Sequence, residues 1–411
     1  MDLLRIFASE SSIHGLAHLV RSPHWLEKAF WLTMLVFSVV CSVSICNMHW
    51  ERFQKNATVL NVETNYLSWV FRPPAATVCS DHVSEDMLNQ LLQRYDMIDS
   101  FSGYWQMERN HSDYGYYRRF LLTVNHARFD NLNTFAPFAS DKNLASVSLV
   151  DLARELKYPL APPWKTFAPV LTEVGVCYSS TKLYGFQSPY TDRPPTEMYI
   201  HVEQDVMTTD SSIHYVLREH DIISSSLSVE QVVASKALKQ LSRLRRKCRL
   251  PGERLTHFGL YTINLCRINC RIEAALELCK CVPFFYNIGK TSCTPAGLYC
   301  LSRNHAGWYK SKNCTCQPLC ESISFRQVLV KRKVLEQANS KLETQIIYPR
   351  MRMKRDVLFD ISNLIVSFGG AAALFLGCSF ISFVEVLFFV LEYVTKKVYR
   401  YYHRDRNRDR S

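Results

Sequence analysis

The chain has 411 residues, of which 47% are hydrophobic and 21% are charged, and its formal net charge is +12. With so much apolar sequence and little glycine or proline, it does not have the composition of a disordered protein. The positive charge is compatible with nucleic-acid binding, but no nucleic-acid-binding motif accompanies it. Much of this charge follows the second apolar stretch, so we expect it to meet anionic membrane lipid.

Two apolar stretches are long enough to cross a membrane. Ala29 to Met48 is a run of 20 residues without a charge, and about 20 residues span a bilayer core. This run is too long, and begins too far into the chain, for a cleaved signal peptide. The second stretch runs from about Leu364 to Val394. Two spans predict that both ends of the chain lie on the same side of the membrane.

The segment between the spans indicates which side that is. It holds 12 of the 15 cysteines and three glycosylation triplets, which begin at Asn56, Asn110 and Asn313. Such cysteine density is typical of an oxidising compartment, and the basic C-terminal tail fits the positive-inside rule. We therefore predict a plasma-membrane protein with cytoplasmic residues 1–28, a first span at 29–49, an extracellular domain at 50–360, a second span at 361–394 and a basic cytoplasmic tail at 395–411.

The second span contains the residues that suggest a pore. Glu385 is a carboxylate at membrane depth, where a charge is costly and usually functional. Gly377, Cys378 and Ser379 combine small residues with a hydroxyl, and non-helical backbone is tolerated in a membrane where it lines a water-filled path. The alternative is helix packing through the small residues Gly369, Ala373 and Gly377. Both interpretations can hold at once.

The extracellular segment shows several local patterns. Met198, Ile200 and Val202 alternate with polar residues, which predicts a half-buried strand, and residues 229–247 look helical and basic. Cys266 and Cys270 share one face of a predicted helix, and Cys314 and Cys316 share one face of a predicted strand. Because these spacings span similar lengths, two disulfides could join the helix and strand. Zinc ligation by the same cysteines is the alternative.

Taken in order, six segments make the chain resemble the degenerin/epithelial sodium channel family, and most of all its pickpocket branch. One is a cytoplasmic His-Gly motif, four belong to the extracellular domain, and the last is a G-x-S selectivity filter. They are Ser12–Gly15, FRPPAATVCS at 71–80, FAPVLTEVGVCY at 167–178, KCRLP at 247–251, CKCVPF at 279–284 and Gly377–Ser379.

The resemblance implies a trimer of identical or related subunits. Each subunit would have two transmembrane helices flanking a disulfide-rich α/β domain with palm, thumb, finger, knuckle and ball regions. It also implies six disulfides: Cys79–Cys177, Cys248–Cys320, Cys266–Cys316, Cys270–Cys314, Cys279–Cys300 and Cys281–Cys293.

The resemblance further implies a sodium-preferring, amiloride-sensitive type of channel that is gated by an extracellular ligand, protons or force. We expect such a channel to be no enzyme and to need no cofactor or metal beyond the permeant sodium ion. The filter would be Gly377, Cys378 and Ser379, with Glu385 as an inner cation site. The implied gating residues are His14, Gly15, Val366, Ser367, Gly369 and Gly370. The Val366 position usually holds a smaller residue in the family, so we expect a shifted balance between closed and open states.

Three alternatives stay open from the sequence. A non-conducting accessory or receptor subunit would keep the same motifs. An ATP-gated type of two-span channel shares the topology and the cysteine density, but it does not explain the His-Gly and G-x-S motifs. A two-span ectonucleotidase would need phosphate-binding or metallohydrolase motifs, and the sequence contains none of these.

Overall fold

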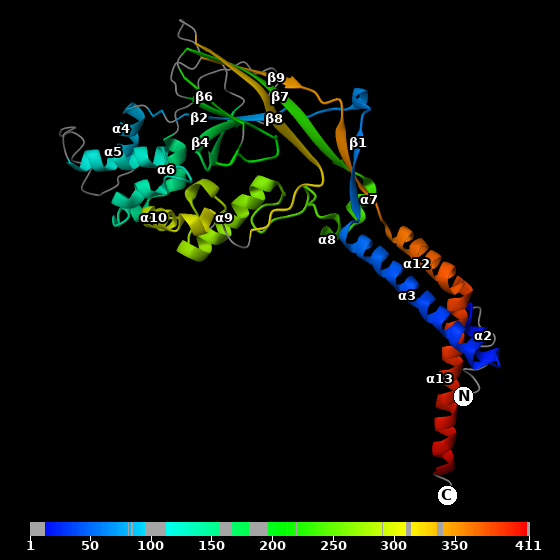
Figure 1. Cartoon of the computed structure of the whole chain (residues 1–411). Coiled ribbons are helices and arrows are strands. Elements are labelled where there is room, and N and C mark those ends of the chain that lie inside the picture. Colours follow the sequence, from blue (N-terminus) through cyan, green and yellow to red (C-terminus); the bar gives the residue numbers. More distant parts are fainter. Residues whose placement is uncertain are drawn as a thin grey trace. The chain divides into compact units, whose positions relative to one another are not determined.

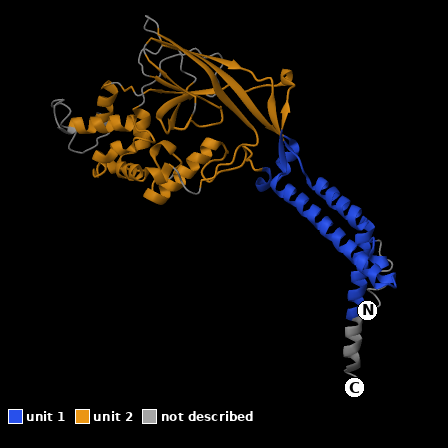
Figure 2. Ribbon diagram, in the orientation of Figure 1, with its two compact units in different colours: residues 1–60, 235–246, 356–411 blue, residues 61–234, 247–355 orange. Residues whose placement is uncertain are grey.

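The computed structural model describes residues 13–80, 82–83, 85–94, 112–156, 167–180, 196–211, 213–218, 220–289, 291–309, 314–334 and 340–408. The chain divides into two compact units (Figure 2). Unit 1 comprises residues 1–60, 235–246 and 356–411, and unit 2 comprises residues 61–234 and 247–355.

Unit 1 is helical and is built around two antiparallel helices. Its helices are α2 (Leu16–Arg21), α3 (Trp25–Lys55), α7 (Lys236–Gln240), α8 (Arg243–Arg246), α12 (Ile361–Leu376) and α13 (Phe380–Arg408). Figure 1 shows α12 running alongside α3. A small apolar cluster holds the pair together, with Phe53 of α3 packed against Phe359 and Leu364. Within the described residues, α3 is the one unbroken helix that is long and apolar enough to cross a membrane.

Helix α3 is longer than the span predicted at residues 29–49, because it extends from Trp25 to Lys55. At 1.5 Å per residue, its 31 residues measure about 46 Å, whereas a bilayer core is about 30 Å thick. The sequence contains no glycine or proline between residues 24 and 55, so nothing in it ends the helix at the edge of the apolar run.

The second predicted span, residues 361–394, is not one continuous helix. Helix α12 ends at Leu376, α13 begins at Phe380, and the two axes are bent by 78°. Taken together they have the length and composition of a broken span or a re-entrant segment. Helix α13 continues to Arg408, so the predicted basic tail from residue 395 is helical over most of its length.

Unit 2 contains most of the two five-stranded sheets. In the first, β1 (Thr58–Glu63), β10 (Arg352–Val357), β7 (Asp221–Ala234) and β8 (Ser322–Val334) lie in that order, and β9 (Lys341–Ile347) also pairs with β7. In the second, the order is β3 (Ala168–Thr172), β4 (Gly175–Ser180), β2 (Ala75–Ser80), β5 (Thr196–His201) and β6 (His214–Leu217).

Two local predictions for this unit were partly wrong. The strand around Met198 exists as β5, but Tyr199 on its other face is also buried, because both faces of the sheet are covered by apolar side chains. Residues 229–247 were predicted to be helical, but β7 continues to Ala234 before α7 and α8 begin. The β-branched residues Val229, Val232 and Val233 favour the strand.

The helices of unit 2 surround the largest apolar core. They are α4 (Glu85–Arg94), α5 (Ser112–Asn125), α6 (Leu149–Glu155), α9 (Ile263–Cys279), α10 (Pro295–Arg303) and α11 (His305–Tyr309). The centre of this core contains Phe120, Phe135 and Trp308, each fully buried. These buried aromatic side chains pack the helices of unit 2 against one another.

Six disulfides form within unit 2, and they are the six pairs that the family resemblance implies. Cys266 and Cys270 lie on α9 as expected. Cys314 and Cys316 do not lie on a strand, because the chain from 314 to 318 is irregular. All four cysteines are used in disulfides, so the zinc alternative does not apply to them.

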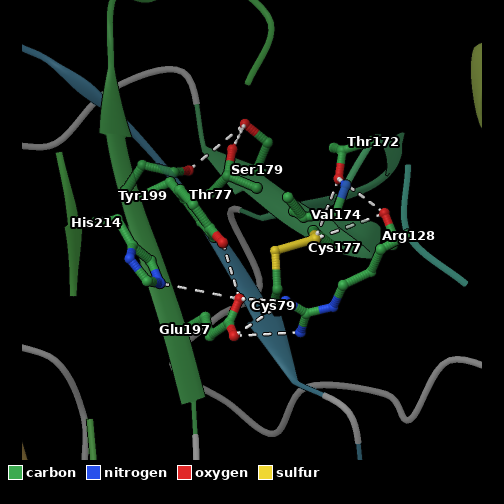
Figure 3. The surroundings of a disulfide bond; sticks show 12 residues. Thr77, Cys79, Arg128, Thr172, Val174, Cys177, Ser179, Glu197, Tyr199 and His214 are labelled. Atoms are coloured by element: carbon green, nitrogen blue, oxygen red, sulfur yellow. Dashed lines mark hydrogen bonds and ion pairs between the residues drawn. A yellow bond between two sulfur atoms is a disulfide. The ribbon is translucent and has the colours of Figure 1, made fainter. Parts of the chain in front are cut away.

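The Cys79–Cys177 disulfide joins two neighbouring strands, β2 and β4, at directly opposite positions (Figure 3). Beside it, the Arg128 guanidinium pairs with Glu197 on β5, with a nitrogen–oxygen distance of 3.2 Å. The Tyr199 hydroxyl donates to the same carboxylate at 2.8 Å. The Arg128–Glu197 pair fastens the second sheet to the segment that follows α5.

Candidate functional site

The strongest candidate site is the break between α12 and α13, where the sequence predicted a filter. Gly377 ends α12 in the left-handed conformation, with φ of 64°. The N–H groups of Gly377 and Cys378 donate to the carbonyls of Ala373 and Ala372, at 3.0 and 3.3 Å. This Schellman-type ending favours glycine. Gly377, Cys378 and Ser379 therefore form a short non-helical segment between two helices.

The other side of the break is fixed by two serines. The Ser379 N–H donates to the Ser382 hydroxyl at 3.0 Å, and the Ser382 N–H donates to the Ser379 hydroxyl at 3.4 Å. This reciprocal arrangement resembles a capping box. Ser382 is buried, and sequence reasoning missed it, although its spacing of three residues from Ser379 was the available signal. The cap restricts how Ser379 can turn.

The predicted His-Gly motif lies directly against this break. The backbone N–H of His14 donates to the carbonyl of Leu376, the last residue of α12, at 3.0 Å. The His14 imidazole also occupies the space that a Cβ atom on Gly377 would need. The structure thus brings together two predicted sites from opposite ends of the chain. Ser12 lies outside the described residues.

The His-Gly segment is itself held on α3. Gly15 has φ of 86°, and a Cβ atom there would lie 3.5 Å from the Trp31 ring. His18 on α2 stacks on the same ring, with centroids 4.6 Å apart. Sequence reasoning identified neither His18 nor Trp31, because an aromatic residue in an apolar run gives no sign of a distant partner. Trp31 connects the His14 contact to the first predicted span.

The other predicted gating residues lie on α12, most of them at exposed positions. Leu364 and Ala371 are buried, whereas the Val366 side chain is 72% exposed. A Cβ atom on Gly369 or Gly370 would meet no atom of the described chain within 4 Å. Packing within the described part of the chain therefore does not require the small residues at 369 and 370. Ser367, on the same helix, is half-buried.

Glu385 lies on α13, beyond the break. It is half-buried and lies six positions after Ser379, which corresponds to about 9 Å along a helix axis. Cys378, which lies between Gly377 and Ser379 in the predicted filter, is half-buried and forms no disulfide. A small-residue segment with a hydroxyl, followed by an acid further along the same helix, can coordinate and attract cations.

An arginine that the sequence did not single out joins the other ends of α3 and α12. The Arg245 Nε donates to the Phe53 carbonyl at 3.2 Å, and its Nη2 donates to the Phe359 carbonyl at 3.4 Å. Its guanidinium carbon lies 3.5 Å from the centre of the Phe53 ring, within the range of a cation–π contact. Burial lowers the pKa of Arg245. Arg245 thus clasps the end of one predicted span to the start of the other.

A second titratable site lies in the sheet that carries the Cys79–Cys177 disulfide. His201 Nδ1 donates to the Val202 carbonyl at 2.9 Å, and its Nε2 lies 2.8 Å from the Thr77 hydroxyl. The Thr77 oxygen is also 3.0 Å from the Ser179 hydroxyl. Burial lowers the pKa of His201 below its ordinary value, against the opposing effect of nearby backbone carbonyls. Folding therefore favours the neutral imidazole.

We expect acid to destabilise the protein through His201. Between the folded and unfolded pKa values the unfolded chain binds more protons, so stability falls as the pH drops below about 6.5, by at most about 1.4 kcal/mol per pH unit. Apparent melting temperatures at about pH 7.5 and pH 5.5 test this. His201→Gln should reduce the acid-induced fall, whereas His126→Gln, at an exposed position, should not. Equal falls in all three proteins would contradict the prediction.

Comparison with known proteins identifies the family of the chain. Residues 7–389 match the family model described as "Amiloride-sensitive sodium channel". The chain is 21% identical to the sodium channel protein Nach of Drosophila ananassae, over 93% of this chain and 85% of the relative. It is 28% identical to Pickpocket protein 11 of Drosophila melanogaster, over 38% of this chain and 34% of that protein.

A relative outside the insects matches over a similar length. The chain is 20% identical to the bile acid-sensitive ion channel of Homo sapiens, over 93% of this chain and 84% of that protein. The family is one of plasma-membrane cation channels that assemble as oligomers of related subunits, and it is not an enzyme family. The family match covers nearly the whole chain, from the His-Gly motif through Glu385. The chain belongs to the amiloride-sensitive sodium channel family, with pickpocket-type relatives.

Proposed function

We propose that this chain is a pore-forming subunit of a trimeric, sodium-preferring, amiloride-sensitive type of cation channel, gated by an extracellular stimulus. The observation that carries the proposal is the break at Gly377–Ser379, with His14 bound to the end of α12. A tightly capped, non-helical turn within an apolar helix pair suits a selectivity filter better than a plain anchor, because an anchor has no need to interrupt its helix.

The proposed topology has two spans. Helix α3 would be the first span, and α12 with the apolar part of α13 would be the second. The six disulfides of unit 2 support an extracellular location for residues 50–360. The ends at 1–28 and 395–411 would be cytoplasmic. Asn56 is exposed at the end of α3, and Asn110 and Asn313 lie outside the described residues, so all three remain predicted glycan sites.

A trimer gives the filter residues a physical role. Three copies of Gly377–Ser379 around one axis would offer backbone carbonyl and hydroxyl oxygens to a partly dehydrated cation, which is the usual basis of a selectivity ring. A Cβ atom on Gly369 or Gly370 would meet nothing within 4 Å in the described chain, so these positions leave room for neighbouring copies or for the ion path. Three Glu385 side chains would raise the local cation concentration.

The experiment that tests this function is voltage clamp of cells that express the full chain, with its surface level measured. External sodium is replaced by potassium and then by a large organic cation, with and without amiloride. We expect a blockable, sodium-preferring current, and Ser379→Ala should change the sodium-to-potassium preference. The matched control is Ser362→Ala on the same helix pair, which should leave the preference unchanged. An unchanged preference in Ser379→Ala would mean that this chain does not form the filter.

Val366 provides a separate prediction about gating. Its side chain is 72% exposed in the single chain, so in an assembled pore it would face another copy or the ion path. We expect Val366→Gly to change the open probability without changing selectivity, because residue size at this position would set how closely the helices approach. Single-channel recording measures this directly. An open probability equal to that of the parent channel would remove Val366 from the gating residues.

A further inference from the structure

Residues 236–246 follow β7 of unit 2 and belong to unit 1, and the chain returns to unit 2 at Lys247. We call these residues the α7–α8 elbow. It is firmly held rather than loosely attached. Leu238 is fully buried, and the Ser235 hydroxyl caps α7 by accepting from the Leu238 N–H. The buried Arg246 guanidinium donates to the Leu241 carbonyl at 3.2 Å. The Arg245 clasp then ties the elbow to α3.

The Arg245 contacts also fix the position of the elbow along the axis of α3. The apolar run ends at Met48, and the Phe53 carbonyl that Arg245 binds lies five residues further, or about 7.5 Å along the helix. The headgroup layer on each side of a bilayer is about 5 to 8 Å thick. Trp50, which is 49% exposed, lies between these two points, and exposed tryptophan is typical of the membrane interface. With α3 placed across a membrane, the elbow would lie at the level of the lipid headgroups.

At this level the elbow exposes one large apolar side chain among cations. The Leu244 side chain is 84% exposed, although the residue on each side of it, Arg243 and Arg245, is an arginine. Lys236, Lys239 and Arg243 are exposed on the same elbow. An apolar tip surrounded by lysine and arginine is the pattern of segments that lie in the membrane interface.

We propose that the α7–α8 elbow docks on the lipid of the membrane that α3 crosses. Leu244 inserts between the headgroups, while Lys236, Lys239 and Arg243 bind lipid phosphates. The inference rests on the proposed function only in requiring that α3 spans the membrane. As a consequence, the elbow that carries Arg245, and so supports the contact between α3 and α12, would itself be bound to lipid.

Brominated lipid tests the insertion, because bromine quenches only nearby tryptophan. The full chain is placed in phosphatidylcholine nanodiscs whose acyl chains carry bromine either near the headgroup or near the methyl end. Three variants each add one tryptophan: Leu244→Trp at the tip, Phe37→Trp on the exposed middle of α3, and Leu60→Trp on β1. Emission is compared with that of the parent protein. Leu244→Trp should be quenched roughly twofold more by the shallow bromines than by the deep ones.

A second series tests the phosphate contacts. Replacing part of the phosphatidylcholine by phosphatidylglycerol should increase the quenching of Leu244→Trp. Changing Lys236, Lys239 and Arg243 to glutamine in that variant should remove the increase, and moderate salt should weaken it. An increase that survives the glutamine changes would overturn the proposed role of these three cations.

The two control tryptophans separate this inference from the proposed function. If Phe37→Trp is quenched but Leu244→Trp behaves like Leu60→Trp, then α3 spans the membrane but the elbow does not reach lipid. A second copy of the chain covering Leu244 would give that same result, and it would overturn the proposal. If Phe37→Trp is not quenched, the span itself fails, and the proposed function fails with it.

Discussion

Gly377→Ala should nearly abolish the current of channels that still reach the cell surface. Gly377 has φ of 64°, a conformation that costs an alanine about 1 to 2 kcal/mol. The larger effect is steric, because the His14 ring fills the space of the new methyl group. Either the ring or the filter segment must move. Since the His14 N–H holds the Leu376 carbonyl, a displaced ring also disturbs the end of α12.

The measurement is whole-cell current divided by surface-labelled protein. The matched control is Gly259→Ala, which makes the same chemical change where a Cβ atom would meet nothing within 4 Å. A double variant identifies the cause. His14→Gly removes the ring, so the methyl group should do less further harm in the His14→Gly background than in the parent, a non-additivity that reports direct contact.

Two results would contradict this explanation. One is full current in Gly377→Ala with His14 intact, which would mean that the turn tolerates a side chain. The other is an equal proportional loss in the presence and absence of the His14 ring. In that case the backbone conformation of Gly377, and not its contact with His14, would be the requirement.

The sequence predicted the local features of this site but not how they meet. Glycine and serine at 377–379 indicated an interruption, because glycine readily leaves the helical conformation. The 78° bend and the contact of His14 with Leu376 depend on packing between the two ends of the chain, which no local pattern encodes. The Arg245 clasp was missed for the same reason, since its partners are backbone carbonyls far away in the sequence, one near the end of α3 and one just before α12.

Unit 2 was predictable to a different extent. The six disulfide pairs came from the family resemblance, and the spacing of Cys266 and Cys270 correctly indicated a helix. The spacing of Cys314 and Cys316 wrongly suggested a strand, because two residues of irregular extended chain give the same separation as two residues of strand. Residues 229–234 were misassigned as helix because the basic residues that follow them masked a valine-rich strand end.

A buried ion pair in unit 2 was invisible in the sequence, since its members come from separate segments. Arg271 on α9 donates to both oxygens of Glu173 at 2.6 and 2.5 Å, and its other nitrogen donates to Asp210 at 2.8 Å. The Tyr286 hydroxyl donates to Glu173 at 2.5 Å. Burial would lower the pKa of Arg271, but the charge and hydrogen bonds of Glu173 outweigh it and raise that pKa.

Removing one partner of this pair should be among the most destabilising single changes in unit 2. The side chains of Glu173 and Arg271 are 1% and 5% exposed, so Arg271→Met leaves a carboxylate buried without its counter-ion. Such a loss costs about 3 to 5 kcal/mol, which in a unit of this size lowers the melting temperature by about 10 °C. To measure this, the full chain is solubilised in detergent and heated to a series of temperatures. The size-exclusion peak of the folded protein that remains after each step gives the melting temperature.

The control and the rescue decide whether charge is the cause. Arg118→Met breaks a pair whose side chains are 34% and 63% exposed, and such pairs contribute about 0 to 1 kcal/mol. Its melting temperature should therefore stay close to that of the parent. Glu173→Gln added to Arg271→Met should recover part of the loss, because a buried amide costs less than a buried carboxylate. If it recovers nothing, Arg271 stabilises the unit through packing on Phe129, 4.4 Å away, and not by neutralising Glu173.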